Sequence, residues 1–202
     1  MIAVLTGDIV NSRDIDPKLW LKELKNELSE HGLQWKDWEV YRGDSFQLKV
    51  PQEKALEVAV FIKARIKKFK ELDVRIAIGL GDIDYVAERV TESNGSAFSN
   101  SGECFDSLKK SNLEIRSSWQ HFDRTINLML HLAALTMDSW SPVSSQILLT
   151  GLKFPELNQI ELAEKLQKKS QGTISEGLKR GGYEEIHKLL LYYKDEISKK
   201  CL

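Results

Sequence analysis

The stretch Ile2-Ala3-Val4-Leu5-Thr6-Gly7-Asp8, near the start of the chain, decides the fold. Its first four residues are apolar and partly β-branched, and Gly7-Asp8 bounds the run. This is the pattern of a strand that is buried on both faces rather than of an amphipathic segment. The sequence therefore predicts a fully buried first strand.

The next segments predict a helix, two strands, a second helix and a fourth strand. The first helix is expected over residues 17–31, and the β-prone segments 38–41 and 46–50 are expected to form a hairpin through Arg42-Gly43-Asp44-Ser45. Pro51 opens the second helix, and alternation over residues 74–78 predicts the fourth strand. This order is the split βαβ arrangement of ferredoxin-like folds, so the expected class is α+β.

That topology predicts that two distant carboxylates lie together. In such a sheet the first and third strands are antiparallel neighbours, so the end of the first lies beside the start of the third. Asp8 and Asp44 occupy those two positions. Carboxylate oxygens are preferred ligands of hard divalent cations, so the two residues are candidate ligands of one cation.

The second half of the chain predicts one more strand and several helices. Residues 91–102 are rich in small polar side chains and predict a loop that leads into a short helix ending near residue 110; a strand over 113–116 and a long helix from Trp119 to Ser141-Pro142 follow. The last third predicts only helices, over residues 143–151, 158–166, 171–180 and 183–199. We expect a sheet domain over 1–118, a linker helix over 119–140 and a small all-helical domain over 141–202.

Two of the later helices have the pattern of a helix-turn-helix. Apolar residues face inward over 158–166 and 171–180, and Ala163 permits close approach of the second helix. The helical part carries a balance of +2, against −3 for residues 1–140. The residues expected to reach base edges and phosphates of duplex DNA are Lys168, Lys169, Gln171, Thr173, Ser175, Lys179 and Arg180. The alternative is a plain helical subdomain with solvated lysines.

Composition excludes several classes of protein. The chain has 202 residues, of which 42% are hydrophobic and 29% charged, with a net charge of −1, so it is neither disordered nor surrounded by a field that captures nucleic acid. Its two cysteines, Cys104 and Cys201, form no CxxC pair and predict reduced thiols. No basic leader precedes the first strand and no apolar run reaches membrane-spanning length, so we expect a cytoplasmic protein without a membrane partner.

The motifs Asp8-Ile9-Val10-Asn11-Ser12-Arg13 and Arg42-Gly43-Asp44-Ser45 resemble those of class III nucleotide cyclases and related palm-like domains. The resemblance implies Mg²⁺ or Mn²⁺ held by Asp8, Asp44 and the Ile9 carbonyl. It also implies a nucleotide or other phosphorylated small molecule, bound by Asn11, Ser12, Arg13, Arg42 and Ser96.

The chain departs from the cyclase pattern at four positions. The expected lysine, purine-selecting, ribose-holding and transition-state residues fall on Val40, Ser96, Ser99 and Glu103. The sequence therefore predicts a cyclase-like metal and phosphate site that lacks the purine-selecting residue and the arginine that stabilises the transition state. No catalytic residue is assigned.

The complete set of motifs, with Gly95-Ser96-Ala97-Phe98 and the terminal helix pair, resembles the bacterial SatD family over essentially the whole chain. The resemblance implies a regulatory protein, and we expect a DNA-binding transcriptional regulator with a degenerate cyclase-like sensing domain. A paired module reads a two-fold site, which predicts a homodimer. Two other functions stay open: a metal-dependent nucleotide-processing enzyme acting through Asp8 and Asp44, and a protein-interaction adaptor. The alternative is that Asp8 and Asp44 have only a structural role, Asp8 as a turn or cap residue and Asp44 as a hairpin residue.

Overall fold

The computed structural model describes residues 1–109, 111–168 and 170–200, and it has an α+β architecture built on a five-stranded mixed sheet. The strands are β1 (Ile2–Val10), β2 (Trp38–Tyr41), β3 (Ser45–Pro51), β4 (Asp73–Gly81) and β5 (Leu113–Arg116), in the spatial order β2-β3-β1-β4-β5. The β4–β5 pair is parallel and the other pairs are antiparallel. The strand that opens the chain is therefore central, as its continuous apolar run requires.

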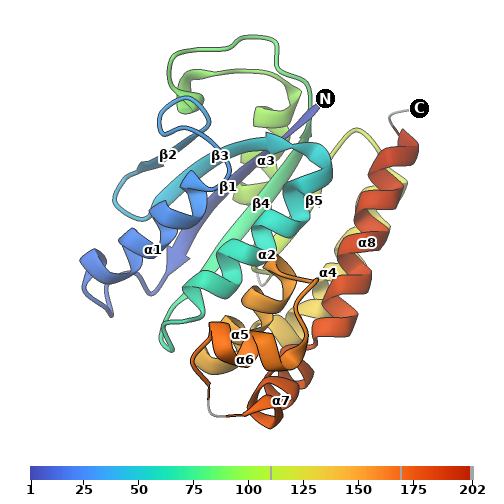
Figure 1. Ribbon diagram of the computed structural model, residues 1–202. Helices are drawn as coiled ribbons and strands as arrows, with labels where there is room; N and C mark the ends of the chain where they lie inside the picture. Colours follow the sequence, from blue (N-terminus) through green and yellow to red (C-terminus); the bar gives the residue numbers. More distant parts are fainter. Residues whose placement is uncertain (110, 169, 201–202) are drawn as a thin grey trace.

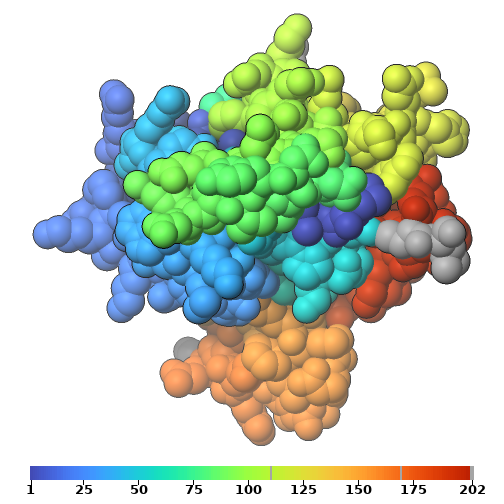
Figure 2. Space-filling model, turned by 90° about the horizontal axis from the view of Figure 1, so that it is seen from above, coloured from blue at the N-terminus to red at the C-terminus, as the bar shows by residue number. Residues whose placement is uncertain are grey.

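Eight α-helices are present in the described part of the chain. Two of them, α1 (Pro17–Ser29) and α2 (Ala55–Ile66), cover one face of the sheet, and α3 (Ser96–Ser107) lies against the other (Figure 1). The remaining helices are α4 (Gln120–Met137), α5 (Pro142–Lys153), α6 (Gln159–Lys165), α7 (Gln171–Gly181) and α8 (Tyr183–Lys200). Figure 2 shows the α5–α7 region projecting beyond the sheet, while the segment around residues 85–95 lies across the β2 region. The backbone hydrogen bond from Val90 N to Trp35 O, 2.7 Å long, fixes that crossing.

One apolar core extends from the sheet into the C-terminal helices. It begins with the buried residues of β1 and β4, passes through α2, and continues into α5 and α8. Tyr193 of α8 is buried in it, and its hydroxyl donates a 2.7 Å hydrogen bond to the Gln52 carbonyl just before α2. The side chain of Trp140 likewise donates to the Gly181 carbonyl at 2.9 Å. The last helices are therefore packed onto the sheet layer, while the division at residue 141 stays a prediction.

Most of the predicted elements are confirmed, with one larger correction. The expected loop over residues 91–102 is wrong in its second half, because α3 already begins at Ser96. The small residues that suggest a loop instead permit close packing on β4. A Cβ atom added at Gly79 would lie 2.2 Å from the Ala97 carbonyl oxygen, so the helix backbone rests directly on the strand.

Smaller corrections concern helix ends. The first helix ends at Ser29 rather than residue 31, and α2 begins at Ala55, after the 3₁₀ turn Gln52–Lys54, rather than at Pro51. The long helix α4 ends at Met137, before the Ser141 N-cap of α5. Across the described residues, none of the helices combines the length and apolarity needed to span a membrane.

Candidate functional site

The first candidate site lies at the end of β1, where the two predicted carboxylates come together. Asp8 is paired with Ser45 in the β1–β3 register, and the Ile9 amide donates a 3.1 Å hydrogen bond to the Asp44 carbonyl. The topological argument therefore places the backbones of Asp8 and Asp44 correctly. Of the backbone atoms of Ile9, the carbonyl oxygen is the one that could bind a cation.

Arg75 of β4 forms an ion pair with the Asp8 carboxylate. Its Nε donates to Oδ1 at 3.0 Å and its Nη2 to Oδ2 at 2.5 Å, which is a bidentate charge-assisted pair. The hydrogen bonds that Arg75 donates to Asp8, together with the charge of this carboxylate, hold the pKa of the Arg75 guanidinium above its ordinary value. Phe105 of α3 lies 5.4 Å from the guanidinium carbon and covers the pair. A cation at the Asp8 oxygens therefore competes with Arg75 for them.

Sequence reasoning missed Arg75, although a signal for it exists. Asp8 and Arg75 are direct partners in the β1–β4 register, and such partners share one face of the sheet. The same face carries Ser45 opposite Asp8 and Tyr41 opposite Ser45, so a polar row crosses four strands. Burial raises the pKa of the Tyr41 hydroxyl, so this hydroxyl stays neutral.

Only some of the residues predicted to bind phosphate lie beside Asp8 and Asp44. Ser12 donates a 2.7 Å hydrogen bond to an Asp44 carboxylate oxygen, so it belongs to the cluster. Asn11 has a left-handed backbone (φ 60°), and its side chain donates to the Glu71 carbonyl at 3.1 Å, which directs it toward the α2–β4 connection. Arg13 and Arg42 are exposed, one residue after Ser12 and two residues before Asp44.

Ser96 does not join this cluster. Its hydroxyl accepts a 2.9 Å hydrogen bond from the Asp82 amide, just beyond Gly81, which is paired with Ile2 at the other end of β1. Asp8 lies six positions along β1 from Ile2, which corresponds to about 20 Å. In the described part of the chain no group of three or more His, Cys, Asp or Glu side chains could hold a metal ion.

The second candidate site is the surface of α7. The predicted contact residues Gln171, Thr173, Ser175, Lys179 and Arg180 are all exposed on this helix, and Lys168 is half-buried in the connection before it. Lys169 lies outside the described residues. The Nη2 of Arg180 lies 3.6 Å from a Glu176 carboxylate oxygen on the same exposed surface, so the helix presents one acid among its cations.

Local sequence fixes how α6 and α7 are held. Asn158 and Glu161 form a capping box at the start of α6, and the Ser170 hydroxyl accepts from the Thr173 amide at the start of α7. The two helices enclose a small core formed by Ile147, Leu162, Ala163 and Ile174. A Cβ atom at Gly177 would lie 2.4 Å from an Ile147 methyl carbon, so α7 packs closely on α5.

Helix α5 connects this helical group to the sheet layer. Ile147 belongs to the small core, whereas Leu148, Leu149 and Leu152 belong to the main core. At its end Lys153 donates to Glu27 of α1 at 2.8 Å. The surface of α7 is therefore held at a fixed position relative to the sheet.

Of the two cysteines expected to be reduced, one lies in the described part of the chain. Cys104 is buried and free, and burial raises the pKa of its thiol to about 12. Such a thiol stays protonated at neutral pH and is a poor nucleophile. Cys201 lies outside the described residues.

Comparisons with known proteins add no assignment. Neither the protein-family models nor the curated proteins match this chain.

Proposed function

We propose that this protein is a DNA-binding regulator that reads duplex DNA with α7. The observation that carries the proposal is the exposure of five polar or cationic side chains on α7 while its opposite face is anchored on α5 and α6. A rigid, capped helix with an exposed polar face fits the major groove, where amides and hydroxyls meet base edges and cations meet phosphates. The α6–α7 pair then acts as a helix-turn-helix.

The sheet part is proposed to be a ferredoxin-like, cyclase-palm-like domain, and the chain a member of the SatD family. The strand order β2-β3-β1-β4, with α1 and α2 on one face, supports this interpretation. The strand β5 and the helix α3 are additions to this ferredoxin-like core.

The test of DNA binding is fluorescence anisotropy with a random duplex library at several salt concentrations. Each of Lys179→Ala and Arg180→Ala is expected to weaken binding and to lower the salt slope by about 1, since one phosphate contact is lost. Lys22→Ala is the matched control, because Lys22 is exposed on α1, on the sheet domain. Binding that is absent, insensitive to salt, or equally weakened by all three variants would contradict the proposal.

The sheet domain is proposed to sense a phosphorylated small molecule together with Mg²⁺ or Mn²⁺. The Asp8–Arg75 pair suggests how the two bind together: an anionic phosphate attracts Arg75, and Asp8 then becomes available to the cation beside Asp44. The hard oxygen donors of Asp8, Asp44 and the Ile9 carbonyl suit either metal. The cation supplies charge neutralisation for the phosphate.

The test of sensing is the thermal midpoint with a nucleotide panel, with and without each metal. A ligand that binds the folded state raises the midpoint by linkage. The rise is expected to require metal and phosphate together and to be lost in Asp8→Ala and Asp44→Ala. A rise with metal alone that survives in Asp8→Ala would show that the coupled exchange is wrong.

A metal-dependent nucleotide-processing enzyme is the second candidate, favoured by the adjacency of Asp8 and Asp44. It predicts turnover of ATP or GTP that Asp44→Asn abolishes. Binding of nucleotide without turnover would leave the sensing role.

A further inference from the structure

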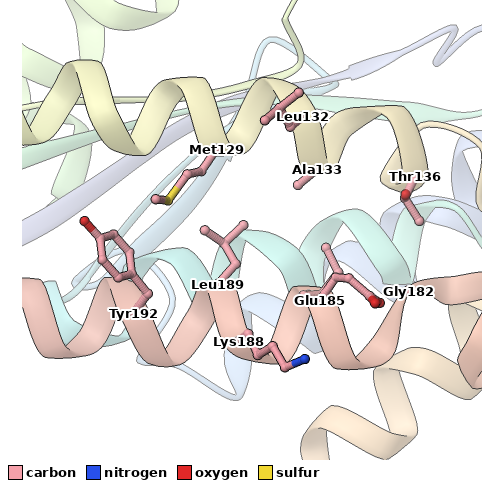
Figure 3. Close-up of a pocket in the computed structure, with 10 residues that line it drawn as sticks. Met129, Leu132, Ala133, Thr136, Gly182, Glu185, Lys188, Leu189 and Tyr192 are labelled. Carbon is pink, nitrogen blue, oxygen red and sulfur yellow. The ribbon is translucent and has the colours of Figure 1, made fainter.

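Helices α4 and α8 lie side by side and leave an apolar groove between them at the surface. The groove has a volume of about 500 Å³ and is lined mainly by apolar side chains, among them Met129 and Leu132 of α4 and Leu189 and Tyr192 of α8. Figure 3 shows the Met129, Leu189 and Tyr192 side chains directed into the space between the two helices. We call the surface formed by these side chains and the exposed leucines of α4 the α4–α8 face.

The exposed leucines of α4 are Leu128, Leu132 and Leu135, with exposures of 62%, 61% and 78%. Their spacing of four and three residues places them on one stripe of the helix. The other side of α4, with Phe122, Ile126 and Leu130, is buried in the core, so the fold does not need the leucine stripe. A contiguous exposed apolar surface of this kind marks an interaction site.

We propose that a second copy of this chain covers the α4–α8 face. The leucine stripe suits a two-fold pairing, because an antiparallel copy of α4 places Leu128 against the copy's Leu135, with Leu132 near the axis. Each copy then offers the same apolar surface that it covers.

The charges of the face also favour a second copy. Glu185 and Lys188 are the charged residues of the groove, and neither forms an ion pair with another described residue. They sit one turn apart on α8, so a two-fold pairing brings Glu185 of each copy toward Lys188 of the other. The face has no net charge, and two copies meet without like-charge repulsion.

The area of the face places such a dimer at the small end of specific interfaces. Each helix has 18 residues and is about 27 Å long, so two adjacent helices present a face of about 500 Å². Two copies bury about 1,000 Å², which reaches the lower limit for a specific interface. The inference does not depend on DNA binding. Gly182, at one end of the groove, follows α7 directly, so a dimer formed through this face would carry two α7 surfaces.

The experiment is sedimentation equilibrium of the full chain over a range of protein concentrations. The wild type is expected to reach twice the chain mass. Leu132→Glu is expected to raise the dimer Kd by about a hundredfold or more, because it places a charge in the apolar centre. Leu19→Glu is the matched control, since Leu19 is an equally exposed helical leucine (57%) on α1. Far-ultraviolet circular dichroism shows that each variant is folded.

A charge-exchange pair of variants separates a second copy from any other occupant. Glu185→Lys is expected to raise the dimer Kd by about tenfold, and adding Lys188→Glu is expected to restore it, because each copy carries both changes. A wild type that stays monomeric at every concentration would overturn the proposal and leave the face to a different protein. A dimer that Leu132→Glu and Leu19→Glu weaken equally would overturn it as well. Failure of DNA binding alters neither result.

Discussion

Glu27 provides the sharpest test of how the C-terminal helices are held on the sheet domain. This carboxylate lies on α1, is fully buried, and accepts hydrogen bonds from Arg65 of α2 at 2.6 Å and from Lys153 of α5 at 2.8 Å. A third contact, to His31, is 3.3 Å long. Three helices therefore meet at one buried anion.

The pKa of Glu27 gives the expected magnitude. Burial by itself raises this pKa, but the hydrogen bonds from His31, Lys153 and Arg65, with the charge of Lys153, lower it from 4.5 to about 2. Because the folded-state pKa is depressed, the associated stability is present above the unfolded value and is lost as the pH falls toward the folded value. The full effect is about 3 kcal/mol, of which about 2 kcal/mol is lost between pH 7 and pH 3.

The perturbation is Glu27→Gln, and the assay is urea unfolding at pH 7 and at pH 3. At pH 7 the variant is expected to lose about 3 kcal/mol, since Arg65 and Lys153 lose the buried carboxylate and keep only the more exposed Glu30 as a shared partner. Between pH 7 and pH 3 the free energy of unfolding of the variant should fall by about 2 kcal/mol less than that of the wild type. Glu30→Gln is the control, because Glu30 contacts the same cations from a side chain that is 49% exposed and should cost about 1 kcal/mol or less. Identical pH dependence in Glu27→Gln and wild type would refute the reasoning.

Three further substitutions test the packing of the fold. Gly79→Ala is expected to cost about 3 kcal/mol or to shift α3, because its Cβ meets helix backbone at 2.2 Å; thermal unfolding measures the cost. Tyr193→Phe removes the donor to the Gln52 carbonyl and should cost about 1–3 kcal/mol in urea unfolding, with an unchanged structure by circular dichroism. Ser12→Ala should cost about 1 kcal/mol by removing the donor to Asp44, and a loss near zero would show that the contact is replaced by water.

The elements whose sequence repeats with a clear period were predictable. The alternation of β4 and the leucines of α1 each have the period of one kind of element, and the short apolar run of β1, bounded by Gly7-Asp8, has the length of a strand. Helix α3 was not predictable in its first half, because Ser96 to Gly102 lacks an apolar stripe. What stabilises it there is the space left by the glycines of β4, and that is a property of the packed pair rather than of either segment.

The candidate site was predictable in its backbone and not in its side chains. Strand order alone brings Asp8 beside Asp44, whereas the partner of the Asp8 carboxylate depends on the β1–β4 register, which one residue of slippage would change. The same limit applied to Ser96, whose position depends on the start of α3. Glu27 was missed because a glutamate in an amphipathic helix ordinarily faces solvent, and its burial follows from α5 of the last third of the chain.

One strand pairing and two ion pairs link the end of β1 to the C-terminal helices. Val10, two residues after Asp8, is paired with Asp73 at the start of β4. The buried Lys63 of α2 contacts Asp73 and also Asp138, which caps the end of α4, each at 2.7 Å. One cation is therefore shared by the strand end and by the residue that precedes the turn into α5. Because leaving a buried charge unpaired is costly, a movement of Asp73 away from Lys63 changes how firmly Lys63 holds Asp138. If the proposed ligand at the Asp8 end displaces the start of β4, the displacement reaches Asp138 and the turn into α5 through the charge of Lys63.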